Sequence, residues 1–170
     1  KAEDFFGGSD EYHGVGGALR VEEPRVRWEI LDAWRDAAAE CGIPKIKEFN
    51  RGDNFGNAYF HMNQRRGMRW SATKAFLRPV LHRSNLKVLT QAHVQRVRID
   101  SRDGVKRATA IEVRLGQGET QLVEARREVI LAAGSIGSPQ ILQVSGIGAG
   151  ALLQQYGIPV VHELPGVGEN

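Results

Sequence analysis

The sequence predicts a mixed α/β (α+β) fold, in which a three-stranded antiparallel meander is inserted between two buried parallel strands. The first observation is the segment 128–133, in which an uninterrupted apolar run follows Glu128, as is typical of a strand covered on both faces. The second is a series of segments with alternating apolar and polar residues, at 93–99, 108–115 and 120–125. The third is the helical spacing of apolar residues over 26–41.

The composition is that of an ordinary globular domain. The chain has 170 residues, of which 41% are hydrophobic and 25% charged, so it is long enough to bury one sizeable core. Its apolar runs are far shorter than the roughly 20 residues that a membrane helix needs. The single cysteine, Cys41, excludes an internal disulfide and is expected in the core. The five histidines lack the spacing of a ligand set, so no metal site is expected.

The first half of the chain predicts one clear helix and short pieces of sheet. A glycine-rich loop leads into a short strand at 18–21, and the helix over 26–41 is expected to end at Gly42. A turn-rich segment follows at 43–57, and a second short strand at 58–62.

A basic loop is expected next, where Arg65, Arg66 and Arg69 stand close in sequence to Phe60 and Trp70. Such a mixture of arginines and aromatic residues can bind a nucleic acid strand. A solvated loop, or a positive wall facing an anionic ligand or another part of the protein, is the more common explanation. Because the net charge of the whole chain is only +3, we expect no nucleic acid partner.

The second half begins with a helix and continues with sheet patterns. Ser71 is positioned to cap a helix over 72–82, which Pro79 is expected to kink or end early. A buried strand is expected at 86–90. The dipeptide Asp103-Gly104 is typical of a tight hairpin turn between the first two strands of the meander.

Residues 146–151 contain G-x-G-x-G-A, which is close to the glycine loop of dinucleotide-binding proteins. That loop requires a strand before its first glycine. Here Ser138-Pro139 instead opens a predicted helix, with the serine as its N-cap. We therefore interpret these glycines as a helix C-cap, followed by a short helix over 149–156.

The turn at 134–138 is the better candidate for a ligand contact. It follows the predicted strand at 128–133 and precedes a helix. This order places backbone N–H groups and a helix N-terminus beside a ligand at the carboxyl edge of a sheet. An ordinary connection between a strand and a helix is the alternative interpretation.

Residues 134–148, Gly-Ser-Ile-Gly-Ser-Pro-Gln-Ile-Leu-Gln-Val-Ser-Gly-Ile-Gly, resemble the second signature of the glucose-methanol-choline (GMC) flavin oxidoreductases. Other segments are similar to choline dehydrogenase-like members of that family, at 12–17, 67–79, 85–90 and 165–170. The resemblance therefore covers essentially the whole chain.

The resemblance implies part of a GMC-type FAD-binding fold and assigns roles to a few residues. It places the backbone of Val94 at the adenine of FAD, although Val94 can also be simply an inward-facing strand residue. It places Ala133, Gly134 and Ser135 beside the flavin nucleotide, where small residues allow the backbone to come close.

The resemblance also implies a division of labour along the chain. Residues 1–68 correspond to part of the substrate-binding or cap region, and 69–170 to part of the FAD-binding domain. The glycine-rich nucleotide loop of the family and its catalytic histidine have no counterpart in this sequence. We therefore expect a central portion of a larger enzyme that contains no catalytic residue, with His61 and His93 as surface or turn residues.

The expected function is that of an FAD-dependent oxidoreductase acting on CH–OH donors, in which hydride passes from an alcohol carbon to flavin N5. The isolated segment is expected to be inactive and to support FAD binding. The expected partners are a small-molecule alcohol and the remainder of the enzyme. The expected location is cytoplasmic, as in a bacterial relative, with peripheral membrane association left open. Substrate, electron acceptor and oligomeric state are not fixed by the sequence.

Two alternatives to this function stay open. One is an inert structural or interaction module without a cofactor. The other is a non-redox relative on the same flavin fold, either a lyase or a photodecarboxylase. The resemblance argues against the photodecarboxylase, because Ala132 stands where those enzymes have a cysteine.

Overall fold

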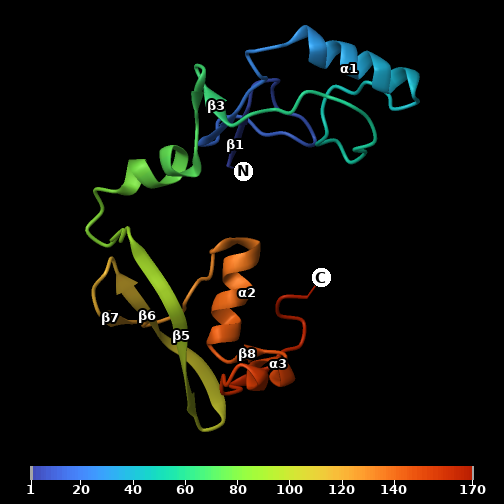
Figure 1. Ribbon diagram of the computed structural model, residues 1–170. Coiled ribbons are helices and arrows are strands. Elements are labelled where there is room, and N and C mark those ends of the chain that lie inside the picture. Colours follow the sequence, from blue (N-terminus) through green and yellow to red (C-terminus); the bar gives the residue numbers. More distant parts are fainter. Residues whose placement is uncertain (1, 170) are drawn as a thin grey trace. The chain divides into compact units, whose positions relative to one another are not determined.

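The computed structural model describes residues 2–169 and divides into two compact units between Lys87 and Val88 (Figure 1). Its helices and its antiparallel three-stranded sheet confirm the predicted mixed α/β fold. The predicted functional boundary lies earlier, at 68/69, and the assignment of cap and FAD-binding regions stays a prediction. Within the described residues, no helix is long and apolar enough to cross a membrane.

The first unit contains two small sheets. β1 (Glu3–Phe5) pairs in parallel with β2 (Leu19–Val21), which confirms the strand expected at 18–21. The expected basic loop is instead a tight hairpin of β3 (Gln64–Arg65) and β4 (Met68–Arg69). The strand expected at 58–62 is wrong: only Met62 forms a bridge, through two backbone hydrogen bonds to Glu22.

Helix α1 (Glu29–Glu40) confirms the predicted helix, and Gly42 follows it with a φ of +88°. Its apolar face is not buried as the spacing suggests. Ala38 is its only buried residue, whereas Ile30 and Trp34 are 69% and 61% exposed. Cys41 is also exposed, so the expectation that it lies in the core is wrong. The periodicity identified the helix, but the described residues do not cover this face.

The short helical stretch that follows changes its winding along its length. A π-helical turn, η1 (Thr73–Leu77), runs into a 3₁₀ turn, η2 (Arg78–Val80). Pro79 lies within the 3₁₀ turn, in agreement with the predicted early end of this helix.

The second unit is built on the predicted meander (Figure 1). β5 (Ala92–Arg102), β6 (Val105–Leu115) and β7 (Thr120–Glu124) form an antiparallel sheet in that order. Asp103 and Gly104 make the turn between β5 and β6, with φ angles of +51° and +78°, as expected for this dipeptide.

Helix α2 (Gly134–Val144) runs beside β5 and in the same direction (Figure 1). The Oγ of Ser145, the residue after α2, accepts a 2.8 Å hydrogen bond from the backbone N–H of Val97 on β5. The predicted start at Ser138 is wrong, because the positive φ of Gly134, +85°, already turns the chain into the helix. The Ser138 Oγ accepts a 3.0 Å bond from the Ala133 N–H, and Pro139 lies inside the helix.

The C-terminal part confirms the second short helix, α3 (Gly150–Gln155), which packs beside a two-residue parallel pair. That pair consists of β8 (Ile147–Gly148) and β9 (His162–Glu163). Leu153 of α3, only 1% exposed, is the best-buried side chain of this part.

The two buried parallel strands expected at 86–90 and 128–133 are not formed within residues 2–169. Both segments lie outside any helix or strand, and Ile130 is 78% exposed. A strand needs neighbours that complete its ladder of backbone hydrogen bonds. No described strand pairs with either segment.

Candidate functional site

The three adjacent residues predicted to contact the cofactor lie at the N-terminal end of α2. Ala133 precedes the helix, and Gly134 and Ser135 are its first two residues. All three are exposed. A Cβ added to Gly134 would meet nothing within 4 Å, so packing does not require this glycine, but its φ of +85° does.

The same helix end has the chemistry of an anion site. The first N–H groups of a helix have no partner within the helix, and the helix dipole favours negative charge beside them. Phosphate oxygens are the groups that such an end commonly binds. The arrangement at Gly134 therefore fits the phosphate-bearing part of a nucleotide.

Val94, the fourth predicted contact, is half-buried on β5 opposite Val113. The register of β5 against β6 shifts between Val94 and Arg96, so the ladder is irregular at this point. Val94 is the third residue of β5, and Gly134 is the first of α2. The two elements run side by side in the same direction, so both positions lie toward the same end of this unit (Figure 1).

Gly146 directly follows Ser145, the C-cap residue of α2, with a φ of +85°, which confirms the interpretation of this glycine as part of a helix C-cap. The glycines of the segment 146–151 also allow close packing. A Cβ on Gly146 would lie 2.5 Å from the carbonyl oxygen of Pro159. A Cβ on Gly148 would lie 3.3 Å from the side chain of Gln143. A Cβ on Gly150 would collide with the carboxylate of Glu163, which accepts a 3.0 Å bond from the Gly150 N–H. Atoms of the same chain therefore fill the space beside these glycines, which leaves no room there for a nucleotide.

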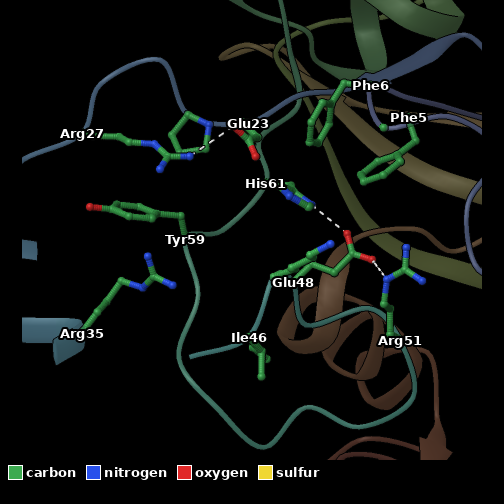
Figure 2. A pocket seen from close by; sticks show the side chains of 13 residues that line it. Phe5, Phe6, Glu23, Arg27, Arg35, Ile46, Glu48, Arg51, Tyr59 and His61 are labelled. Atoms are coloured by element: carbon green, nitrogen blue, oxygen red, sulfur yellow. Dashed lines mark hydrogen bonds and ion pairs between the residues drawn. The ribbon is translucent and has the colours of Figure 1, made fainter. Parts of the chain in front are cut away.

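A pocket of about 530 Å³ lies in the first unit (Figure 2). Its walls come from the segment after β1, from the residues leading into α1, from α1 itself and from the loop 46–61. Aromatic and basic side chains dominate the lining, among them Phe6, Arg27, Arg35, Lys47 and Tyr59.

Beneath this pocket, His13 forms a buried group with carboxylates from distant parts of the chain. It is 3% exposed, and its ring stacks on Phe5 with centroids 3.8 Å apart. Its Nδ1 lies 3.3 Å from Glu3 Oε1, and its Nε2 lies 3.0 Å from Glu48 Oε1. Since carboxylate oxygens only accept, both ring nitrogens are placed to donate.

Burial alone would lower the pKa of His13, but the hydrogen bonds to Glu48 and then to Glu3 outweigh it and raise the pKa above its ordinary value. Glu48 also pairs with Arg51, and its other oxygen lies 3.6 Å from His61 Nδ1 (Figure 2). His61 is thus not the surface residue that was expected, since its side chain is only 11% exposed.

Sequence reasoning missed this group because no spacing connects its members. The partners of His13 lie 10 and 35 residues away in sequence. The one available signal was the segment 12–17, which resembles the GMC family, but that resemblance names no partner. Among residues 2–169, no cluster of His, Cys, Asp and Glu is arranged to hold a metal ion.

Comparison with known proteins gives relatives of the whole chain. It is 39% identical to the oxygen-dependent choline dehydrogenase of Photobacterium profundum, matching all of this chain and 29% of that protein. It is 34% identical to the chloroplastic fatty acid photodecarboxylase of Chlamydomonas reinhardtii, again over the full chain and 29% of that protein.

Solved structures agree with these relatives. An FAD-dependent oxidoreductase from Chaetomium thermophilum superposes with a TM-score of 0.83 at 28% identity, over 98% of this chain and 30% of that one. The chain thus spans about 30% of the length of the proteins it matches. The family model of the GMC oxidoreductases matches residues 7–170, and the chain therefore belongs to the GMC oxidoreductase family.

Proposed function

We propose that this chain is part of an FAD-dependent oxidoreductase that oxidises an alcohol, and that its second unit helps to hold the cofactor. Membership of the GMC family and the likeness to a choline dehydrogenase and to an FAD-dependent oxidoreductase support this assignment. The proposed partners are a small alcohol and the remainder of the enzyme. The proposed location is cytoplasmic, with peripheral membrane association as the alternative.

The observation that carries the proposal is the open, exposed N-terminal end of α2. Gly134 has a φ of +85°, which a residue without a side chain adopts readily. No atom outside its immediate neighbours and its own helix backbone lies within 4 Å of the position that a Cβ would occupy. A ligand can therefore approach the backbone directly. In the proposed complex, N–H groups of the first turn of α2 would hold the phosphate oxygens of FAD, and the backbone of Val94 would contact its adenine.

In this mechanism the residues of the chain bind and orient, and bound FAD supplies the chemistry by accepting hydride from the alcohol carbon. Removal of the hydroxyl proton requires a positioned base. We assign that role to no residue of this chain. His13 is unsuited to it, because both of its ring nitrogens already face carboxylates.

The test is a titration of the purified chain with FAD, followed by flavin fluorescence. Binding at the end of α2 is expected to change the fluorescence. The variant Gly134→Ala is expected to weaken binding at least about tenfold, since a side chain is strained at this φ and its Cβ occupies the ligand's approach.

A matched control is Gly104→Ala at the β5–β6 turn. Gly104 also has a positive φ, +78°, and open space around it. Both variants therefore carry a similar backbone penalty, but only the first touches the proposed site. Equal FAD affinity in the two variants would rule out the end of α2 as the cofactor contact.

Two other functions are separated from the proposed one by different measurements: the inert module by the same titration, and a non-redox flavin enzyme by its reaction. A chain that is folded but binds no FAD at any concentration supports the inert module. A non-redox use of the flavin is the second alternative, because a photodecarboxylase is among the relatives, but Ala132 at the position of the cysteine of those enzymes argues against it. For that alternative, the longer enzyme would release CO₂ from a carboxylic acid only under light and would oxidise no alcohol in the dark.

A further inference from the structure

The segment 47–51 of the first unit is a loop that its own backbone does not hold in place. It lies outside any helix or strand, and its backbone groups form no hydrogen bond with other backbone groups of residues 2–169. The residue before it is anchored, because the Ile46 N–H donates a 3.0 Å bond to the carbonyl oxygen of Asn57. The position of the 47–51 loop therefore depends on its side chains.

Glu48 is the main anchor of this loop. Among residues 47–51 it is the one buried residue, and its carboxylate lies 3.0 Å from His13 Nε2 and pairs with Arg51 (Figure 2). Phe49 stacks on Phe60 with ring centroids 4.8 Å apart, but Phe60 is itself 73% exposed. The contact with His13 is thus the buried attachment of the loop.

His13 provides this attachment fully only while both of its ring nitrogens carry a proton. Its Nδ1 faces Glu3 at 3.3 Å, while Nε2 faces Glu48. A neutral imidazole has a single N–H, so after loss of the proton to solvent one of the two carboxylates would face a lone pair. The positive charge between the carboxylates would disappear at the same time.

Of the two carboxylates, Glu48 is the one that can move. Glu3 lies in the ladder of β1 and β2, and its second oxygen accepts a 2.9 Å bond from the Gly14 N–H. Glu48 lies in a loop without such bonds. Its partner Arg51 is held by Asp10 at 2.6 Å, but both of those side chains are substantially exposed, and exposed ion pairs contribute little stability. Loss of the proton is therefore expected to displace the loop and not β1.

Charged and titratable groups surround His13 on every segment that packs against it. They are Glu3 on β1, Asp10 in its own loop, Glu48 and Arg51 in the 47–51 loop, and His61, whose Nδ1 lies 3.6 Å from Glu48. Burial lowers the pKa of His13, but the hydrogen bonds to Glu48 and Glu3 together raise it above the ordinary value of 6.5. The proton is therefore lost as pH rises above neutrality.

We propose that His13 is a pH-sensitive latch for the 47–51 loop: protonated, it holds the loop to the rest of the unit through Glu48, and neutral, it releases the loop while the unit stays folded. Glu48 and Arg51 line the pocket of about 530 Å³, so release of the loop opens one wall of that pocket (Figure 2). The latch lies wholly in the first unit and does not depend on the assignment of FAD.

NMR relaxation of the purified chain tests the latch. Backbone order parameters of residues 47–51 are expected to be about 0.85 at about pH 6 and to fall below about 0.6 at about pH 9, as in a loop that has become flexible. Those of β1 and β2 are expected to stay near about 0.85 at both pH values, which distinguishes local release from unfolding. The midpoint of the change in the loop should equal the midpoint measured on the ring protons of His13.

Three results of this titration would overturn the proposal. The first is an order in the loop that does not change with pH. The second is a loss of order in β1 and β2 at the same pH as in the loop. The third is a midpoint in the loop that differs from that of the His13 ring. This test needs no variant, so it stands even where a variant fails to fold.

Two glutamate variants locate the latch. Glu48→Gln removes the charge that His13 holds, and it is expected to abolish the difference in loop order between the two pH values. Glu23→Gln is the matched control, because Glu23 lines the same pocket but pairs with Arg27 instead of His13. This control is expected to keep the full pH response. A response that persists in the first variant, or is lost in the second, contradicts the latch.

The variant His61→Gln separates the two histidines that face Glu48. It is expected to keep both the change in loop order and its midpoint, because the contact between His13 and Glu48 remains. Loss of the pH response in this variant would assign the switch to His61 and overturn the role of His13.

Discussion

At the scale of single residues, the buried His13 is the most informative feature of the first unit. It connects Glu3 at the start of the chain to Glu48 in a distant loop, and Phe5 stacks on its ring. A buried carboxylate that loses its donor is left with the cost of desolvation. His13 therefore stabilises the unit through the charges that it neutralises.

The raised pKa of His13 fixes the sign of a pH effect. A raised pKa in the folded state means that its stabilisation is complete below the ordinary value of 6.5 and is lost as pH rises through the folded-state pKa. Each unit of difference corresponds to about 1.4 kcal/mol. Denaturant unfolding at a series of pH values is expected to show this decline above neutrality.

The variant His13→Gln tests the origin of that decline. It is expected to lower the free energy of unfolding by about 1–3 kcal/mol at pH 6 and to flatten its pH dependence. His93→Gln, an exposed histidine on β5, is the control and should behave like the original chain. An unchanged slope in the His13 variant would assign the pH dependence to another group.

At the scale of elements, local patterns predicted well and long-range pairing did not. The meander, its Asp103-Gly104 turn and helix α1 follow from the order of residues along a short stretch. The strands expected at 86–90 and 128–133 depend on neighbours, and the described chain supplies none.

The candidate sites show the same difference between residues that are close in sequence and residues that only the fold brings together. The predicted residues 133–135 could be located from a signature in the sequence, and they lie together at one helix end. The group around His13 and the pocket of the first unit are assembled from residues that are far apart in sequence. No local sequence pattern predicts that such distant residues come together, so their proximity is seen only in the folded structure.

Ser145 joins two elements of the second unit. Its hydroxyl accepts the backbone N–H of Val97 at 2.8 Å, and it is only 8% exposed. Ser145→Ala is expected to reduce the free energy of unfolding by about 1–3 kcal/mol, because the buried N–H loses its acceptor. Thermal unfolding measures the loss, and Ser101→Ala, at an exposed position of β5, is expected to cost less than about 0.5 kcal/mol.

At the scale of the whole molecule, the chain behaves as two compact units joined near Lys87. The residues around this junction are mostly exposed and lie outside any helix or strand. Exposed segments of this kind are the preferred sites of proteolysis.

Limited trypsin digestion is therefore expected to cut first after Arg83 or Lys87, giving two fragments that mass spectrometry identifies. Arg98, inside the β5–β6 ladder, is expected to be cut much later. The double variant Arg83→Gln, Lys87→Gln should delay the first cut. Early cleavage within β5 would contradict the division into units.

The exposed tryptophans at and just before α1 provide an intrinsic fluorescence signal for whatever covers this helix. Trp28 and Trp34 are each 61% exposed, so two of its three indole rings sit in water and should emit at long wavelength, with ready quenching by acrylamide. Anything that covers these residues, such as the remainder of the enzyme proposed above, should shift that emission to the blue. Assembly can thus be followed by light alone, without a label.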